Sequence, residues 1–540
     1  MTPLVAEAQA RHAAGDLAGA ERLYRRALQA DPRNAGALRL LAALLAARGN
    51  PTEGLRLARR ASSLVPDDPE LWRLRADLHV RLGETAEALA CLDRCDSLRP
   101  DDPVVALNRG SLLARAGRAT EALAAFDAAL QLAPGAPAAL SSRGLALLEL
   151  NRPAEALASF DQWQALSPAD PAMHEQRGQA LQALDRHEEA IACFDRALAR
   201  QPRFPDALNH RGVSQQALGD TEAALASYDA AIALAPDDPW YRWNAGLCHL
   251  LRGEYEAGWA GFEARLRTGA IPQPRFDRPA WQGEKLRGRT LLLHTEQGLG
   301  DIIQFARFAP LLPDAGRVVL QVPAVLLDLL RGLPVEVVPV GTRPPRFDLH
   351  CPLLSLPARL RITRADLPAA DIPYLHVPAA RVADLAARIG PGGRRIGICW
   401  QGNPAVRIDR DRSVPLHQFR ALAAVPDVRL ISLQKTHGLD QIGALPELEV
   451  LGPDGPRDFL ETAAAMRALD LVITSDTVTA HLAGALGCPV WLATSFVPDW
   501  RWERSGETSP WYPSMRLFRQ QRRGDWGSVF AAMAAALTGA

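Results

Sequence analysis

A strict repeat of 34 residues runs through the first half of the chain and limits what that half can fold into. Small residues recur at this spacing from Ala20 to Gly258, and a bulky side chain follows each of them four positions later, except at Ala58. One series of prolines keeps the same spacing: Pro32, Pro66, Pro100, Pro134, Pro168, Pro202 and Pro236. We expect two helices per unit, because small residues let two helices approach, the bulky residue fills the gap, and proline ends the second helix.

One helical hairpin of this kind cannot bury its apolar face alone, so neighbouring hairpins are expected to stack into a solenoid. The repeated positions resemble the tetratricopeptide repeat (TPR) over residues 1–266, with seven full units and most of an eighth. The predicted first domain is therefore an all-α TPR solenoid.

Two charged residues recur together in the middle units. An arginine is seventh in its unit (Arg75, Arg109, Arg143, Arg177, Arg211), and an aspartate is twenty-fifth (Asp93, Asp127, Asp161, Asp195, Asp229). Because base and acid recur together, we interpret them as a ladder of ion pairs within the solenoid. The alternative is a basic groove for an acidic ligand.

The sixth position of these units is polar and uncharged: Asn108, Ser142, Gln176, His210 and Asn244. In solenoids of this type the first helix lines the concave groove. These side chains could therefore contact the backbone of a docked acceptor protein, or they could be solvated on an exposed helix face.

The repeat ends near residue 266, and the proline-rich segment 267–289 reads as a linker. Beyond it, apolar strands alternate with helices, in two series that cover residues 290–392 and 393–540. Such alternation predicts parallel sheets covered on both faces, arranged as two Rossmann-like halves. Ligands bind at the carboxyl ends of parallel strands, so we expect the functional loops after residues 296, 400, 434, 475 and 494.

Two of these loops carry recognisable chemistry. Gly298-Leu299-Gly300-Asp301 places two glycines beside an acid at a helix start. The alternative is that Asp301 has no role beyond capping the helix. Asp476-Thr477-Val478-Thr479 leads from a buried strand into a helix, where free N–H groups favour a phosphate. The alternative there is a cap followed by a packed histidine, His481.

Together these motifs resemble the heptosyltransferase-type glycosyltransferases of family 9, which have the GT-B fold, over roughly residues 288–540. Val478 departs from that pattern, in which glycine is usual. A TPR solenoid followed by a two-lobed transferase is also similar in architecture to the protein O-linked N-acetylglucosamine transferases and to TPR-type flagellin glycosyltransferases. The aromatic-rich stretches Asp499–Trp502 and Ser509–Pro513 are typical of this solenoid-bearing group.

The resemblance implies a role for particular residues. Asp301 matches the catalytic base, Thr477 begins the helix that binds the diphosphate, and Arg412 stands where such enzymes keep a cation. The other expected donor-binding residues are Gly298, Gly300, Trp400, Asn403, Gln434, Lys435, Asp476, Thr479 and His481. Lys435 could equally be a solvated surface lysine. Asp409 and Asp411 look like a metal motif of another transferase fold, which we interpret as coincidence, since a GT-B enzyme needs no metal.

Composition excludes some other classes of protein. Lys+Arg and Asp+Glu both number 61, and this balance disfavours nucleic acid as the main partner. The seven scattered cysteines suggest reduced packing residues. A polar N-terminus and the lack of long apolar runs disfavour secretion and a membrane span, so we expect a cytoplasmic protein.

The sequence therefore predicts an inverting, metal-independent glycosyltransferase without a resident cofactor, with a nucleotide-sugar co-substrate and a protein acceptor docked by the solenoid. Two alternatives stay open. The first is a heptosyltransferase-like enzyme acting on lipopolysaccharide or another cell-surface glycan. The second is a non-catalytic TPR scaffold.

Overall fold

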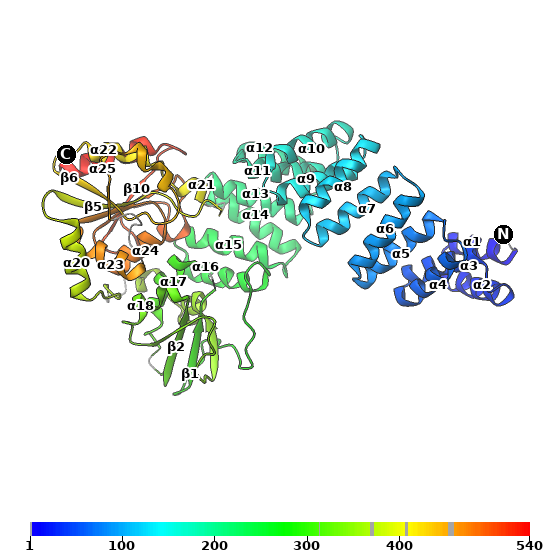
Figure 1. Ribbon diagram of the computed structural model, residues 1–540, viewed down its shortest axis with the longest axis horizontal. Helices are drawn as coiled ribbons and strands as arrows, with labels where there is room; N and C mark the ends of the chain where they lie inside the picture. Colours follow the sequence, from blue (N-terminus) through cyan, green and yellow to red (C-terminus); the bar gives the residue numbers. More distant parts are fainter. Residues whose placement is uncertain are drawn as a thin grey trace. The chain divides into compact units, whose positions relative to one another are not determined.

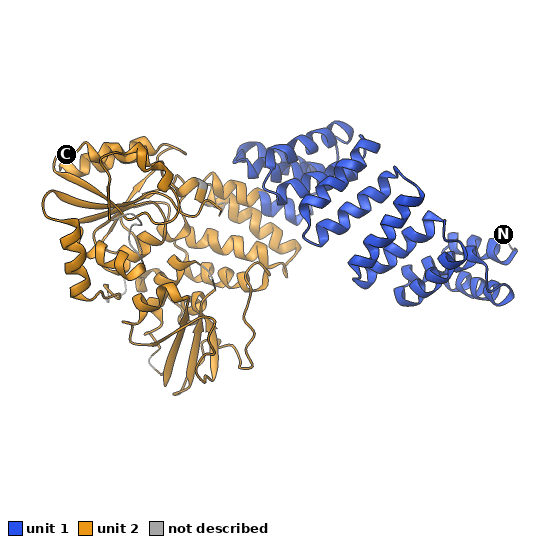
Figure 2. Ribbon diagram, viewed as in Figure 1, with its two compact units in different colours: residues 1–210 blue, residues 211–540 orange. Residues whose placement is uncertain are grey.

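The computed structural model describes residues 3–296, 298–312, 314–367, 372–405, 409–451 and 458–539. It divides into two compact units, residues 1–210 and 211–540 (Figure 2). The division falls inside helix α13 (Pro205–Ala217), while the sequence suggests a domain boundary after residue 266. The second unit thus combines the last repeats with the predicted α/β region.

The first unit consists of helical hairpins, one per 34-residue repeat (Figure 1). Its complete helices are α1 (Pro3–Ala13), α2 (Leu17–Ala30), α3 (Ala35–Ala47), α4 (Pro51–Leu64), α5 (Pro69–Leu82), α6 (Thr85–Leu98), α7 (Pro103–Arg115), α8 (Ala119–Leu132), α9 (Pro137–Glu149), α10 (Pro153–Leu166), α11 (Pro171–Ala183) and α12 (His187–Arg200). From α5 onward the first helix of each hairpin here begins on a proline, where its missing N–H costs nothing.

In the hairpins from α7 to α12, a glycine on the first helix fits against an aromatic ring on the second. A Cβ atom added at Gly144 would lie 2.3 Å from the ring of Phe160, and one added at Gly178 would lie 2.4 Å from the ring of Phe194. Phe160 and Phe194 are fully buried. In these two hairpins the glycine beside the ring therefore allows the paired helices to approach closely.

The predicted ion-pair ladder is present across successive hairpins of the first unit. Arg143 donates to Asp127 at 2.6 Å and Arg177 to Asp161 at 2.7 Å, and Arg109 pairs with Asp93 in the same way. Arg75 differs: it donates to the hydroxyl of Ser62 at 3.2 Å, because the corresponding acidic position in the preceding unit is an arginine.

The second unit opens with the end of the repeats and an extended segment. Its helices here are α14 (Thr221–Leu234), α15 (Pro239–Leu251) and α16 (Tyr255–Phe262), followed by the 3-10 helix η1 (Glu263–Arg267). The predicted linker then runs alongside a sheet, where the amide of Trp281 donates to the carbonyl of His350 at 2.8 Å.

A four-stranded parallel sheet follows, in the order β3-β2-β1-β4. Its strands are β1 (Thr290–His294), β2 (Arg317–Val322), β3 (Glu336–Pro339) and β4 (Leu349–Pro352). The helices around it are α17 (Leu299–Phe305), α18 (Ala324–Leu330) and α19 (Leu356–Leu360). The register pairs Leu292 of β1 with Val319 of β2 and with His350 of β4, so β1 is an inner strand, and its residues 291–294 are buried.

A six-stranded parallel sheet forms the rest of the unit, in the order β10-β9-β8-β5-β6-β7. Its strands are β5 (Arg394–Cys399), β6 (Val428–Ser432), β7 (Glu449–Val450), β8 (Leu471–Thr474), β9 (Val490–Thr494) and β10 (Met515–Arg519). Counted within the sheet, this is the strand order of a doubly wound dinucleotide-binding fold, with the switch point between β5 and β8. The predicted α/β architecture is thus present as two parallel sheets.

Helices cover both faces of the larger sheet (Figure 1). These helices are α20 (Ala379–Ile389), α22 (Arg420–Ala423), α23 (Phe459–Arg467), α24 (Val478–Ala485) and α25 (Trp526–Thr538), and the short helix α21 (Asp409–Arg412) lies between β5 and α22 in the chain. On β6, Leu430 packs in the core beneath α25, while the next residue, Ile431, packs in the core beneath α23. This alternation is what a strand buried on both faces requires.

One hydrophobic core joins both sheets to the last repeat. Trp259 of α16 lies edge-on to Phe305 of α17 and to Trp500 and Trp511 of the C-terminal region. Its indole nitrogen donates to the carbonyl of Ile362 at 2.9 Å. The eighth repeat is therefore built into the α/β part of the unit.

All seven cysteines are buried and free of disulfides, as the sequence suggests. Within the described ranges, no helix combines the length and apolar character needed to cross a membrane.

Candidate functional site

The turn after β1 places a carboxylate at the carboxyl edge of the smaller sheet. Gly298 has φ +45°, and a Cβ atom there would lie 2.3 Å from Oδ2 of Asp301. The carboxylate thus folds back over Gly298, which has to be glycine. Asp301 occupies the first turn of α17.

The second glycine of the motif lets the two sheets' helices meet. A Cβ atom at Gly300 would lie 2.9 Å from Cδ2 of His481 and 3.5 Å from Cα of Val478. Because His481 and Val478 belong to α24, the start of α17 packs directly on the start of α24. The acid of the first sheet and the Asp-Thr loop of the second therefore lie close together, as the sequence analysis requires.

The start of α24 has the geometry of an anion site. Thr477 precedes it with extended backbone (φ −137°, ψ 177°), and its side chain makes no capping hydrogen bond to the helix. N–H groups in the first turn of a helix have no partner within the helix, and the helix dipole there favours negative charge. Thr477, Val478 and Thr479 all line the adjoining cavity.

This cavity has a volume of about 600 Å³ and lies between the loops of the two sheets. It gathers residues from all five loops in which we expected function. Of the predicted residues, those lining it are Gly298, Gly300, Asp301, Asn403, Arg412, Gln434, Lys435, Asp476, Thr477, Thr479 and His481.

Trp400 lies apart from this group. Its side chain is fully buried in the core beneath α25, and its indole nitrogen donates to the carbonyl of Gly438 at 3.2 Å. Successive residues of extended chain point to opposite faces. Cys399 and Gln401 therefore reach the cavity, while Trp400 is a packing residue.

Gln434 and Asn403 shape the loop that follows β5. The side-chain oxygen of Gln434 accepts from the amides of Trp400 at 3.0 Å and Gln401 at 3.1 Å, and its Nε2 donates to the carbonyl of Gln401 at 2.8 Å. Asn403 is exposed and accepts from the amide of Ala405 at 3.0 Å. Gln434 thus holds the loop in place from beneath.

Two cations of the larger sheet's loops were predicted, and the structure places them differently. Arg412 lines the cavity and donates to the buried carboxylate of Asp409 at 3.3 Å. Asp409 also accepts from Ser413 at 2.8 Å, so it holds Arg412 and Ser413. Lys435 is exposed at the cavity edge, with its ammonium 6.0 Å from the ring centre of Phe459.

Arg501 is a charged cavity residue that the sequence analysis missed. It donates to Asp301 at 2.5 Å, to Asp499 at 2.8 Å and to Gln304 at 2.6 Å, and it is nearly buried. It belongs to the 3-10 helix η7 (Trp500–Trp502) after β9. Its position in the loop after residue 494, where we expected function, could have identified it. The sequence analysis interpreted Asp499–Trp502 only as an aromatic-rich stretch.

Burial changes the proton affinity of the acids in the cavity. Burial raises the pKa of Asp301 above its usual value, while the neighbouring Arg501 opposes this rise. Burial and the charge of Asp499 raise the pKa of Asp476 to about 6. The guanidinium groups of Arg412 and Arg501 limit both shifts.

His481 is held neutral. Burial, followed by the charge of Arg501, lowers its pKa well below the ordinary value. Its Nδ1 lies 3.0 Å from the hydroxyl of Tyr512, and its ring stacks on Trp502 at 5.3 Å. His481 therefore has both a packing role and a place in the cavity wall.

The predicted acceptor-contact row is distributed over several helices. In the first unit, Asn108 is exposed, Ser142 and Gln176 are half-buried, and Gln176 accepts from Ser141 at 2.9 Å. His210 lies 2.7 Å from the carboxylate of Glu175. Asn244 lies on α15 of the second unit and is half-buried. Their contact with an acceptor stays a prediction.

No cluster of metal-ligating side chains occurs among the residues that the structure describes. Two acids of the cavity, Asp301 and Asp499, pair with Arg501, and the cavity residue Arg412 pairs with Asp409. The arrangement can hold an anion beside a carboxylate of raised pKa.

Comparison with known proteins finds curated and structural relatives. The chain is 31% identical over 300 residues to Protein FlbA of Caulobacter vibrioides, an alignment that covers 49% of each protein. It therefore spans about half the length of that relative. Among solved structures, a tetratricopeptide repeat protein from Parabacteroides merdae is 20% identical, with a TM-score of 0.38 over 45% of this chain and 97% of that one. MamA from Desulfovibrio magneticus RS-1 is 24% identical, with a TM-score of 0.30 over 31% of this chain and 95% of that one.

Models of the tetratricopeptide repeat match residues 11–78, 69–112, 107–171, 176–239 and 211–269. These ranges coincide with the helical hairpins and their 34-residue spacing. The first half of the chain is therefore built of tetratricopeptide repeats.

Proposed function

We propose that this protein is an inverting, metal-independent glycosyltransferase of the GT-B type, which moves a sugar from a nucleotide-sugar donor to a protein acceptor. The observation that carries the proposal is the cavity of about 600 Å³ in which Asp301, from one parallel sheet, lies beside the uncapped start of α24, from the other. A GT-B enzyme places its donor between two such sheets.

Asp301 is proposed as the base that takes the proton from the acceptor hydroxyl. Arg501 binds its Oδ1, and Oδ2 lies over Gly298. A base must be deprotonated to act; burial raises the pKa of Asp301, and the adjacent guanidinium limits that rise. Attack by the activated hydroxyl on the face opposite the nucleotide inverts the anomeric carbon.

The start of α24 and Arg412 are proposed to stabilise the departing nucleotide diphosphate. Negative charge grows on the phosphate as the bond between the sugar and the nucleotide breaks. Preorganised N–H groups and cations therefore stabilise the transition state more than they stabilise the bound donor. Thr477 and Thr479 add hydroxyl donors at the same place. These groups supply positive charge from the protein itself, so the proposal expects transfer to persist in EDTA.

The tetratricopeptide repeats support a protein acceptor. Repeats of this type present extended surfaces suited to polypeptides. The resemblance to flagellin glycosyltransferases makes flagellin the first acceptor to test. The relative from Caulobacter is matched over about half of each chain, so its role is not carried over to this protein.

Two measurements test the proposal. Thermal unfolding is followed with UDP, GDP, ADP and CMP and with their common sugar conjugates, because a ligand that binds only the folded state raises the melting temperature. Transfer is then assayed with the sugar conjugate that binds. Asp301→Asn should keep the ligand-induced shift and lose transfer by about 100-fold or more.

The outcomes separate the competing functions. Normal turnover by Asp301→Asn would contradict the assignment of the base. Absence of any nucleotide-induced shift in the wild-type chain would contradict the transferase proposal and favour a scaffold. Transfer to a lipopolysaccharide acceptor, but to no protein, would favour the glycan enzyme instead.

A further inference from the structure

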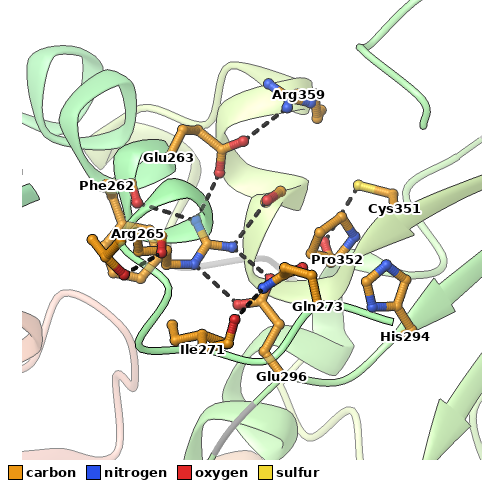
Figure 3. Close-up of polar contacts among 12 residues, drawn as sticks. Phe262, Glu263, Arg265, Ile271, Gln273, His294, Glu296, Cys351, Pro352 and Arg359 are labelled. Atoms are coloured by element: carbon orange, nitrogen blue, oxygen red, sulfur yellow. Dashed lines mark hydrogen bonds and ion pairs between the residues drawn. The ribbon is translucent and has the colours of Figure 1, made fainter. Parts of the chain in front are cut away.

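The last repeat ends in a buried arginine that reaches the smaller sheet (Figure 3). Arg265 of η1 has a side chain only 1% exposed. It donates to both carboxylate oxygens of Glu296, at 3.0 and 2.8 Å, and to the hydroxyl of Ser355 at 2.9 Å. Glu263 accepts from the same guanidinium at 2.8 Å. These three side chains thus fix the guanidinium in the protein interior.

Glu296 lies just before the turn that carries Asp301. It follows β1, precedes Gly298 by two positions, and its side chain is 1% exposed. Burial raises the pKa of Glu296, and the charge of Arg265 opposes that rise. A forked, two-point contact between guanidinium and carboxylate fixes orientation as well as distance.

The turn needs such an anchor. Gly298 adopts a positive φ, and glycine restrains the backbone less than any other residue. At the far end of the turn, Asp301 is held by Arg501. The near end is held through Glu296, by a residue that belongs to the repeats and not to either sheet.

We propose that Arg265 is a positioning residue: by holding Glu296, the last repeat fixes the turn that presents Asp301 to the cavity. The inference rests on the proposed function, since it concerns the placement of the proposed base. It also means that the eighth repeat is a component of the site, in addition to any role in docking an acceptor.

Arg265→Lys and Glu296→Gln test the contact in the full-length chain. Lysine keeps the charge but loses the fork, and glutamine keeps the shape but loses the charge. Arg359→Lys is the matched control, because Arg359 binds Glu263 of the same cluster at 2.8 Å. Hydrogen exchange of the amides of residues 298–305 is measured for all of them, together with kcat and KM for the donor.

The proposal expects faster exchange of residues 298–305 in Arg265→Lys and Glu296→Gln, and wild-type exchange there in Arg359→Lys. It also expects kcat to fall by up to about 100-fold, because small displacements of a reacting group are costly, with little change in KM for the donor. Unchanged exchange in both variants would overturn it, as would equal changes in the control. If the wild-type chain transfers no sugar, the proposed function fails, and the exchange comparison still decides whether Arg265 holds the turn.

Discussion

Arg501 donates a 2.5 Å hydrogen bond to the carboxylate of Asp301, although the two residues are 200 positions apart in the chain. Asp301 follows β1 of the smaller sheet, and Arg501 follows β9 of the larger sheet. The contact therefore joins the loops of the two sheets across the cavity. It also brings a cation to the acid that we propose as the catalytic base.

Replacing Arg501 should change how transfer depends on pH. The pKa of Asp301 is already raised by burial, and Arg501 limits that rise. Because a base is active when deprotonated, activity falls as the pH drops through its pKa. In Arg501→Met the pKa of Asp301 should rise further, so the acidic limb of kcat/KM should move to higher pH.

The control for this change is Arg364→Met. Arg364 pairs with Glu503 near the same segment but is largely exposed and lies outside the cavity. Arg364→Met removes one positive charge from the same region and should leave the acidic limb of kcat/KM at its wild-type pH. An unshifted limb in Arg501→Met would show that Arg501 does not act on the base.

The stability of the protein should reveal the buried carboxyl of Asp476. Its pKa is raised from 3.8 to about 6, so between these values the folded state binds more protons than the unfolded state. Stability therefore decreases as the pH rises through this window, by about 3 kcal/mol from this group. Asparagine does not titrate, so Asp476→Asn lacks this loss. The difference in free energy of unfolding, variant minus wild type, should therefore increase from pH 4 to pH 7. Parallel curves from chemical unfolding at each pH would contradict the prediction.

Gly144→Ala should destabilise the repeats. The added Cβ would lie 2.3 Å from the fully buried ring of Phe160, and overpacking of this kind typically costs about 1–3 kcal/mol. Gly135→Ala, in the turn before the same hairpin, meets no atom within 4 Å and serves as the control. Thermal unfolding followed by circular dichroism compares the two. Equal melting temperatures would mean that the hairpin can widen without cost.

Truncation should show where the catalytic unit begins. Residues 205–540 keep α13–α16 and should give a folded protein. Residues 267–540 lose Trp259, Phe262 and Arg265, and so expose the aromatic core around Trp500 and Trp511. We expect this shorter chain to aggregate or to be cut rapidly by protease. A stable, protease-resistant 267–540 fragment would show that the eighth repeat is separable.

If 205–540 folds, it also tests the role of the removed repeats. Hydrolysis or transfer of the donor sugar to a small acceptor should persist, because the cavity is intact. Modification of a protein acceptor should fall if the first unit docks that acceptor. Undiminished modification would assign docking to the second unit.

The repeats could be read from the chain because their structure depends on neighbours in sequence. Each hairpin needs a small residue, a bulky residue and a proline at set spacings, so the pattern predicts paired helices, a bulky side chain between them and a ladder of arginine–aspartate ion pairs before any coordinates are known. The apolar strands of the two sheets are equally local, and they place Asp301 and Thr477 at strand ends. The short strands β4 and β7 were not predicted, because a few residues carry too little periodicity to distinguish a strand from a loop, and β10 was not predicted either.

The partners across the fold could not be read in this way. Nothing near Asp301 in the chain indicates that Arg501 will bind it, or that Arg265 will hold the turn through Glu296, because such contacts depend on the order in which strands pair and on how two sheets meet. The same holds for Trp400, whose place depends on which face of the strand end it occupies. Local spacing along the chain decided the elements and the chemistry at their ends, and long-range packing decided which of those side chains face one another.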